Sequence, residues 1–229
     1  MTGVGPVLAT CQALLIDLDG TLLDTTHAVE ASWQRAAEHL GISFTRFEPF
    51  MHGIPAGQVI DQIVPGLTRT ERNWVVDRVL ADQMRDDAIV RWMPGGRELV
   101  DDLKGVAWAV VTSSTRLLAE SSMRKAGMPQ PPFMVTADDV GIGKPHPAPF
   151  LRAAYLLHTR PAECVAIEDS PAGIASATQA GIPVIAVAGT YAHHRLASAT
   201  MLVDRLPGVA RDPLTQRIVV TQRGHETEK

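Results

Sequence analysis

Two pairs of acidic residues follow short apolar runs in this sequence. Asp17 and Asp19 come directly after an apolar run at residues 13–16, and Glu168 and Asp169 follow a later run. Residues two apart at the end of an extended strand project to the same side. Four carboxylates gathered together would repel one another and raise one another's pKa unless a cation lies among them. Oxygen ligands suit Mg²⁺, which also accepts phosphate oxygens, so the sequence predicts a site for Mg²⁺ and a phosphorylated ligand.

Hydroxyl groups and one lysine complete this set of polar residues. The segment Thr112–Thr115 follows another apolar run and contains Ser113, whose hydroxyl can donate to an anion. We expect a helix to begin near Thr115 and to offer free backbone N–H groups to the same anion. Lys144 lies in the stiff, glycine-led loop Gly143–Pro147, where its charge can offset the nearby carboxylates. Any one of these segments is weak evidence, but together they predict one anionic ligand site.

The elements that must position these residues are predicted from apolar runs. Runs of this length without alternation favour parallel strands that are covered on both faces. They are Ala13–Ile16, Val106–Val111, Val165–Ile167 and Val184–Val187, with a weaker candidate at Phe133–Thr136. Helical stretches lie between them, one of them beginning at Ser170-Pro171 as N-cap and first helical residue. This alternation predicts an α/β fold with a doubly wound parallel sheet, in which ligands bind beyond the carboxyl ends of the strands.

Helical periodicity replaces the strand pattern between the first and second runs. One apolar stripe ends at Gly41, a second ends at Pro65-Gly66, and a third helix can begin at the capping box Thr68–Glu71. Because the first strand must pair inside the α/β layer, this stretch is predicted to be an inserted cap. The expected division is an α/β catalytic core at residues 1–23 and 93–229, with an all-helical cap domain at residues 24–92.

Composition and charge exclude several other classes of protein. The 229 residues are 45% hydrophobic and 20% charged, which is typical of a globular protein, and the net charge of -4 offers no basic surface for nucleic acid or an anionic membrane. No apolar run approaches the ~18 residues of a membrane-spanning helix, and no basic secretory start is present, so we expect a cytoplasmic protein. Cys11 and Cys164 begin apolar runs, which favours reduced core thiols. Beyond about Val209, residues Arg217–Thr221 can form an extra strand.

The strand-end segments resemble the four motifs of the haloacid dehalogenase superfamily, in the same order. They are Asp17–Leu22, Val110–Ser113, Lys144-Pro145 and Glu168-Asp169. The segments around Lys144 and Glu168 are further similar to the subgroup of β-phosphoglucomutase, small sugar phosphatases and glycerol-phosphate phosphatases. The resemblance covers roughly Ala13 to Leu206, including the place of the cap. It implies a Rossmann-like core with a helical cap and, as the expected function, a phosphatase acting on a small phosphorylated sugar or polyol.

The resemblance implies a chemical role for the two acids of the first motif. Asp17 would attack phosphorus, form an aspartyl-phosphate and bind Mg²⁺, which splits the transfer into two steps. Asp19 would protonate the leaving alkoxide and later take a proton from the attacking water. Its backbone carbonyl would also bind the metal.

The resemblance implies binding roles for the residues of the other three motifs. Ser113, the Ser114 backbone and Lys144 would hold the transferring phosphoryl oxygens. Glu168 and Asp169 would complete the Mg²⁺ site. This agrees with the argument from the residues alone, which already requires a cation among these acids.

One cap segment bears on the choice between a phosphatase and a mutase. His52 and Gly53 are expected to line the substrate side of the site, although a purely structural role in the turn is nearly as well supported. In the resembled family this segment faces the leaving group, and the mutase has an arginine there that clamps a second phosphate. Pro55 and Ala56 occupy the stretch in this sequence. Water is therefore favoured over a sugar-phosphate hydroxyl as the final acceptor, and a β-phosphoglucomutase-like mutase is the alternative.

A second alternative is a phosphorylation-controlled signalling module. Such modules also gather acids, a hydroxyl, a lysine and Mg²⁺ at the edge of a parallel sheet. Asp19, two residues after the acceptor, would hydrolyse a phosphoryl group faster than a signal requires, and the long cap has no counterpart in those modules. The shape of the cap pocket decides which phosphorylated metabolite is bound, and no motif encodes it. The sequence also leaves the oligomeric state open.

Overall fold

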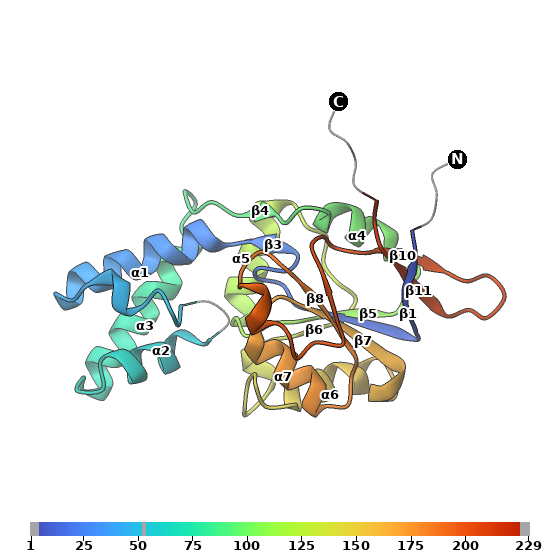
Figure 1. The fold of residues 1–229 in the computed structure, drawn as a ribbon. Helices are drawn as coiled ribbons and strands as arrows, with labels where there is room; N and C mark the ends of the chain where they lie inside the picture. The colour runs from blue at the N-terminus through green and yellow to red at the C-terminus, as the bar shows by residue number, and fades with distance from the viewer. Residues whose placement is uncertain (1–4, 52–53, 225–229) are drawn as a thin grey trace.

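The centre of the protein is a six-stranded parallel sheet (Figure 1). The structure is a computed structural model that describes residues 5–51 and 54–224. The strand order is β6 (Met134–Val135), β5 (Trp108–Val111), β2 (Ala13–Ile16), β7 (Cys164–Glu168), β8 (Val184–Val187) and β9 (Met201–Val203). Every neighbouring pair is parallel. The five predicted runs are confirmed as strands of this sheet, and its sixth strand, β9, was not predicted.

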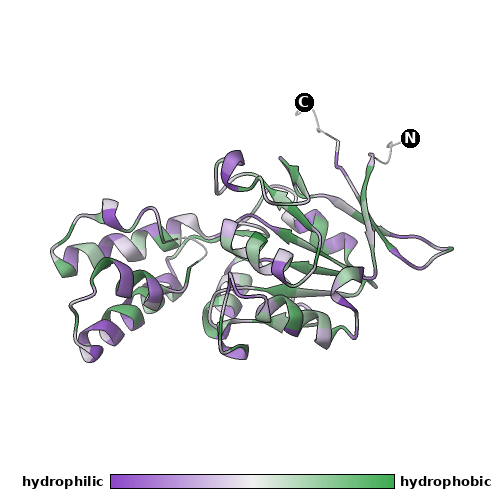
Figure 2. Ribbon diagram, turned by 60° about the horizontal axis from the view of Figure 1, so that its bottom comes forward, coloured by the Kyte–Doolittle hydropathy of each residue, from purple (hydrophilic) through white to green (hydrophobic). Residues whose placement is uncertain are grey.

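Helices cover both faces of this sheet, as the doubly wound prediction requires. Side chains of α4 (Gly96–Asp102) and α5 (Arg116–Ala126) share one hydrophobic cluster with Leu14 of β2. Those of α6 (Ala148–Leu156) and α7 (Pro171–Gln179) share a second cluster with the next residue of β2, Leu15. Because side chains alternate between the faces of a strand, a strand buried on both faces is apolar throughout. Figure 2 shows this as hydrophobic colour along the strands.

Three further helices form a body beside the sheet layer, at the left of Figure 1. They are α1 (Thr26–Leu40), α2 (Ala56–Ile63) and α3 (Arg69–Met84). Their apolar faces enclose a core of their own, in which the rings of Trp33 and Phe47 stack with centroids 4.9 Å apart. This body therefore has the separate core that a cap needs.

The predicted helix ends in this body are confirmed by the backbone. Gly41 follows α1 with a φ of 65°, the left-handed conformation that ends many helices. At the start of α3, the Thr68 hydroxyl accepts from the Glu71 N–H while the Glu71 carboxylate accepts from the Thr68 N–H, which is the predicted capping box.

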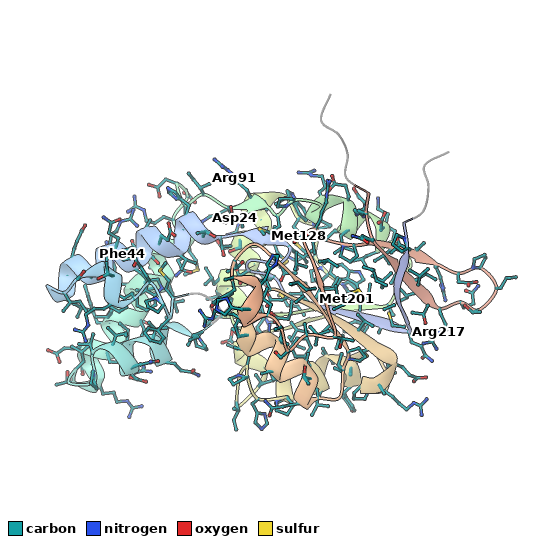
Figure 3. All side chains as sticks on the ribbon, in the orientation of Figure 1. Asp24, Phe44, Arg91, Met128, Met201 and Arg217 are labelled. Carbon is teal, nitrogen blue, oxygen red and sulfur yellow. The ribbon has the colours of Figure 1, made fainter. Side chains whose placement is uncertain are left out.

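The two chain segments that connect the helical body to the sheet layer pair with each other. They are β3 (Leu23–Asp24) and β4 (Arg91–Trp92), an antiparallel two-stranded sheet in which Asp24 lies opposite Arg91. Figure 3 shows these two residues near each other at the root of the helical body, with Phe44 farther out. Movement of the body relative to the sheet layer would have to be absorbed at this paired root.

A second sheet brings the two ends of the described chain together. The strands β1 (Val7–Cys11), β11 (Ile218–Thr221) and β10 (Gly208–Arg211) form an antiparallel sheet with β11 in the middle. The extra strand predicted at Arg217–Thr221 is confirmed as β11. Strands β1 and β10 were not predicted, because the apolar residues that begin β1 are exposed or half-buried and β10 has only two apolar residues in succession.

Both cysteines lie in the core. Cys11 ends β1 and Cys164 begins β7, and each is a free, buried thiol, so the prediction against a disulfide framework is confirmed. Burial raises the pKa of Cys11 to about 12 and that of Cys164 to about 11. Among the residues that the structure describes, no helix is both long and apolar enough to span a bilayer.

Candidate active site

The carboxyl ends of four neighbouring strands open into one cavity of about 190 Å³. Because β5, β2, β7 and β8 are adjacent in the sheet, the segments that follow them converge at one edge. The structure places these strand-end residues in the cavity wall: Asp17, Asp19, Gly20, Thr112, Ser113, Ser114, Thr115, Asp169, Ser170, Thr190 and Tyr191. Lys144 reaches the same cavity from the loop before α6.

Lys144 is the charged centre of the site. Its side chain is 2% exposed, and the ammonium donates to Asp17 Oδ1 at 2.6 Å, to Glu168 Oε1 at 2.6 Å and to the Val111 carbonyl at 2.8 Å. Burial alone would lower the pKa of Lys144, but attraction to the two carboxylates outweighs it and raises that pKa. All three ammonium hydrogens have partners. A phosphoryl contact by Lys144 would therefore require one of these bonds to be exchanged.

Three buried carboxylates stand close enough to share one cation. Asp17, Glu168 and Asp169 each offer an oxygen within 4.8 Å of the others. Burial and the neighbouring acids raise the pKa of Asp17 well above its ordinary value, against the attraction of Lys144. Burial, followed by repulsion from Glu168, raises the pKa of Asp169 to about 7. One lysine cannot balance three carboxylates, so this all-oxygen cluster fits the predicted Mg²⁺.

Glu168 is held more firmly than the other two acids. Its Oε2 accepts from the N–H groups of Asp169 and Ser170 at 3.0 and 3.1 Å and from the Ser170 hydroxyl at 3.0 Å. Ser170 is also the predicted N-cap of α7, since its Oγ accepts from the Gly173 N–H. A Cβ at position 173 would overlap both Glu168 oxygens, so glycine is required there. Through these contacts the start of α7 fixes Glu168 against Lys144.

Asp169 is positioned by the loop that follows β2. Its Oδ1 accepts from the Thr21 hydroxyl at 3.2 Å, and Thr190 hydrogen-bonds to the same side chain. Gly20 has a φ of +88°, and a Cβ there would overlap Asp169 Oδ2. Only glycine combines this backbone conformation with so close an approach. The glycine of the first motif thus brings the segments after β2 and β7 together.

Asp19 stands apart from the three clustered acids. Its Oδ2 accepts from the Ser114 hydroxyl at 2.8 Å and from the Thr112 hydroxyl at 3.2 Å. The carboxylate therefore faces the end of β5, so any part it plays in metal binding falls to its backbone carbonyl. The Ser114 N–H donates to Thr112 Oγ1 at 3.0 Å, and this bond would have to open before that N–H could reach a phosphoryl oxygen.

Ser113 differs from its neighbours in having an unused hydroxyl. Its Oγ is buried and has no hydrogen-bond partner among the described residues, as expected of a donor that awaits an anion. Helix α5 begins after Thr115 as predicted, but the expectation of free N–H groups is wrong for two of them. The Arg116 N–H donates to Asp138 Oδ2 at 2.8 Å, and the Leu118 N–H donates to the Thr115 hydroxyl.

The helical body supplies the opposite wall of the cavity. The predicted substrate-side residues His52 and Gly53 lie outside the described residues, but the residues on either side of them, Met51 and Ile54, line the cavity. Pro55 and Ala56 line it too. No arginine or lysine is among the described residues that the helical body contributes to this wall.

The haloacid dehalogenase-like hydrolase profile matches residues 14–187, which include all of β2 except its first residue and every strand-end acid described above. This chain belongs to the haloacid dehalogenase-like hydrolase family. The resemblance read from the motifs is thereby confirmed. The hydrolase is 36% identical over 179 residues to hexitol phosphatase A of Escherichia coli (strain K12), an alignment that covers 77% of this chain and 83% of the relative.

Other similar proteins extend over most of the hydrolase. Validoxylamine A 7'-phosphate phosphatase of Streptomyces hygroscopicus subsp. limoneus is 31% identical over 201 residues, covering 85% of this chain and 94% of the relative. A solved hydrolase from Pseudomonas syringae superposes with a TM-score of 0.75 at 23% identity, covering 85% and 93% of the two chains. That structure supports the fold.

Some wall residues of the hydrolase were missed by sequence reasoning. Thr190 and Tyr191 follow β8, so the rule that ligands bind at strand ends would have found them had it been applied to the fourth run. Gln83 lines the cavity from α3. No sequence signal separates Gln83 from the other polar residues of that helix, because its role depends on how α3 packs.

Removing one clustered carboxylate is expected to change how the hydrolase responds to Mg²⁺. At pH 8, above the pKa of about 7 for Asp169, the metal-free protein holds mutually repelling charges. Asp169→Asn should therefore melt several degrees higher than the unchanged protein in chelator, since 1 kcal/mol corresponds to about 2–4 °C for this size. It should also lose the rise in melting temperature that Mg²⁺ gives the unchanged protein. Thermal scanning with Mg²⁺ and with chelator measures both effects.

The matched control is Asp101→Asn, which removes an exposed acid paired with Lys104. It should leave the response to Mg²⁺ unchanged. An Asp169→Asn protein that Mg²⁺ stabilises as much as the unchanged protein would show that the cluster is not the metal site.

Proposed function

We propose that this hydrolase is a Mg²⁺-dependent phosphatase of small phosphorylated metabolites that works through an aspartyl-phosphate on Asp17. The main support for the proposal is the arrangement of side chains around Asp17. Asp17 lies in the cavity with one oxygen fixed by Lys144, and the unpartnered Ser113 hydroxyl and the carboxylate of Asp19 line the same cavity. In this proposal residues 24–92 are the cap domain, and residues 1–23 and 93–229 are the catalytic core.

The first half of the reaction transfers the phosphoryl group to the protein. An oxygen of Asp17 bonds to phosphorus as the bond between phosphorus and the ester oxygen breaks. Asp19, in its protonated form, gives its proton to the departing alkoxide. The Ser113 hydroxyl donates to a phosphoryl oxygen. Lys144 keeps Asp17 oriented and offsets its charge.

The second half returns the protein to its starting state. Water attacks phosphorus of the aspartyl-phosphate, Asp19 takes the proton of that water, and the bond from phosphorus to Asp17 breaks to release phosphate. Asp17, Glu168, Asp169 and the Asp19 carbonyl would hold Mg²⁺. The bound ion would supply positive charge that offsets the acids and the phosphoryl oxygens. The cap would exclude bulk water during the transfer.

The relatives support this class of substrate. One is named as a phosphatase of hexitols and another as a phosphatase of validoxylamine A 7'-phosphate, and both names describe phosphate esters of small polyhydroxylated molecules. The cap lining, free of lysine and arginine among the described residues, supports release to water over transfer to a second sugar phosphate.

The test is phosphate release from hexose, pentose, polyol and glycolate phosphates, measured with Mg²⁺ and with chelator. We expect Mg²⁺-dependent release from at least one neutral sugar or polyol phosphate. Interconversion of isomers after addition of a sugar bisphosphate, without release, would assign a mutase. A long-lived phosphoprotein without release would assign a signalling module.

A further inference from the structure

The two halves of the cavity differ in charge. Among the described residues of the wall, all of the acidic and basic side chains come from the core. They are Asp17, Asp19, Lys144 and Asp169. The wall supplied by α1, α2, α3 and the segment before α2 contains no acid, lysine or arginine among those residues. The phosphoryl group would thus face charged side chains, and the leaving group would face the uncharged half of the wall.

The cap half is also largely apolar. Among its described side chains, the hydrogen-bonding groups are the hydroxyls of Thr25 and Thr26 beside the start of α1, the indole N–H of Trp33 and the amide of Gln83 near the end of α3. The rest of this wall is formed by Val29, Met51, Ile54, Pro55, Ala56, Gly57, Val76 and Leu80. A group enclosed against such a surface loses its contacts with water and regains few hydrogen bonds.

Gln83 is held in a fixed position. It is 9% exposed, and its side-chain Nε2 donates to the Ser32 hydroxyl at 3.0 Å, which in turn donates to the Val29 carbonyl at 2.7 Å. From the core, Lys125 donates to the backbone carbonyls of Gln83 and Arg85 at 3.0 and 2.6 Å. Both the helical body and α5 therefore anchor this residue. The geometry of an amide anchored this way is set before a ligand arrives.

We infer that the leaving group of the substrate is uncharged, carries a hydroxyl that Gln83 binds, and presents an apolar edge to Val76 and Leu80. The inference rests on the proposed phosphatase function and names its substrate class more narrowly. A second anion or a cation on the leaving group would meet no opposite charge among the described residues of this wall, and an unpaired buried charge is costly. Each additional hydroxyl facing the valine and leucine would lose its hydrogen bonds to water.

Matched substrates test the charge requirement on the unchanged protein. Glycerol 3-phosphate and 3-phosphoglycerate differ by a neutral CH₂OH group against a carboxylate, and 2-hydroxyethyl phosphate and phosphoethanolamine differ by a hydroxyl against an ammonium. We expect kcat/KM to favour the neutral member of each pair by at least about 100-fold. We also expect 2-deoxyglucose 6-phosphate to exceed glucose 6-phosphate by about 10-fold. Equal rates within the charged pairs would overturn the inference.

Gln83→Leu tests the residue. We expect KM for glycerol 3-phosphate to rise about 10-fold with little change in kcat, while KM for p-nitrophenyl phosphate, which has no hydroxyl, stays the same. Gln62→Leu is the matched control, because it removes an exposed glutamine of α2 that does not line the cavity, and KM for both substrates should stay the same. An equal loss on both substrates would show a structural role and overturn the assignment.

The two proposals fail in different ways. Absence of phosphate release from every substrate, p-nitrophenyl phosphate included, would contradict the phosphatase itself. Release from p-nitrophenyl phosphate together with equal release from neutral and charged esters would leave the phosphatase intact and contradict only the leaving-group inference.

Discussion

Asp17→Asn is expected to lower phosphatase activity by more than about 10⁴-fold, because an amide oxygen is too weak a nucleophile to form the phosphoprotein intermediate. Asparagine keeps the shape of the side chain and an oxygen that can accept from Lys144, so the fold should persist. Steady-state phosphate release with Mg²⁺, beside a thermal unfolding curve of the same sample, measures both expectations. Activity within tenfold of the unchanged protein would rule out Asp17 as the nucleophile.

Asp19→Asn is the informative companion to this change. It removes the proposed proton donor and acceptor but leaves the nucleophile, and general acid–base groups contribute about 10²–10⁴-fold. With an activated ester such as p-nitrophenyl phosphate, whose leaving group needs no proton, this variant should accumulate phosphoprotein. Intact-mass measurement after acid quench detects it. Asp17→Asn should show none, which separates the roles of two acids that stand two residues apart.

Lys144→Met is expected to destabilise the protein by about 3–5 kcal/mol at pH 8 in chelator. Removing one partner of a buried ion pair leaves an uncompensated charge, and here two carboxylates, Asp17 and Glu168, would lose the same cation. Both carboxylates are almost fully buried, so water cannot take over the lost contacts. Urea unfolding followed by circular dichroism measures the change in the free energy of unfolding.

The matched control is Lys104→Met, which removes a largely exposed lysine paired with the exposed Asp101. Exposed pairs contribute about 0–1 kcal/mol, so this variant should unfold close to the unchanged protein. A loss of similar size in both variants would mean that Lys144 is no more than a surface cation, contrary to the three contacts seen for its ammonium.

How well the sequence predicts the fold depends on where each strand lies. Strands β2 and β8 are buried on both faces, so continuous apolar runs mark their limits, and the predicted bounds match the structure. Strand β1 mixes exposed and buried positions, and β10 places two exposed residues at its end. Such strands pair with a strand far along the chain, and their own local sequence does not predict that partner.

The same distinction holds for the candidate site. That the strand-end acids share a cavity follows from the rule for parallel sheets and could be predicted. The sequence could not predict which hydrogen-bond donors in that cavity already have partners, because this depends on the packing of α5 and α7 against the strand ends. The N–H groups after Thr115 and the three hydrogens of Lys144 are examples. Gln83 reaches the cavity only through the placement of α3.

The three-stranded sheet that unites the ends of the described chain sets a limit on folding during synthesis. Strand β1 emerges from the ribosome before any other described strand, but its partner β11 emerges after all the others. Because β11 lies between β1 and β10, neither outer strand has its neighbour until residue 221 has emerged. The parallel sheet and the helical body can form earlier, as N-terminal regions generally do. Until then the nascent chain exposes two unpaired strand edges, which are the places where a chaperone or a second nascent chain would bind.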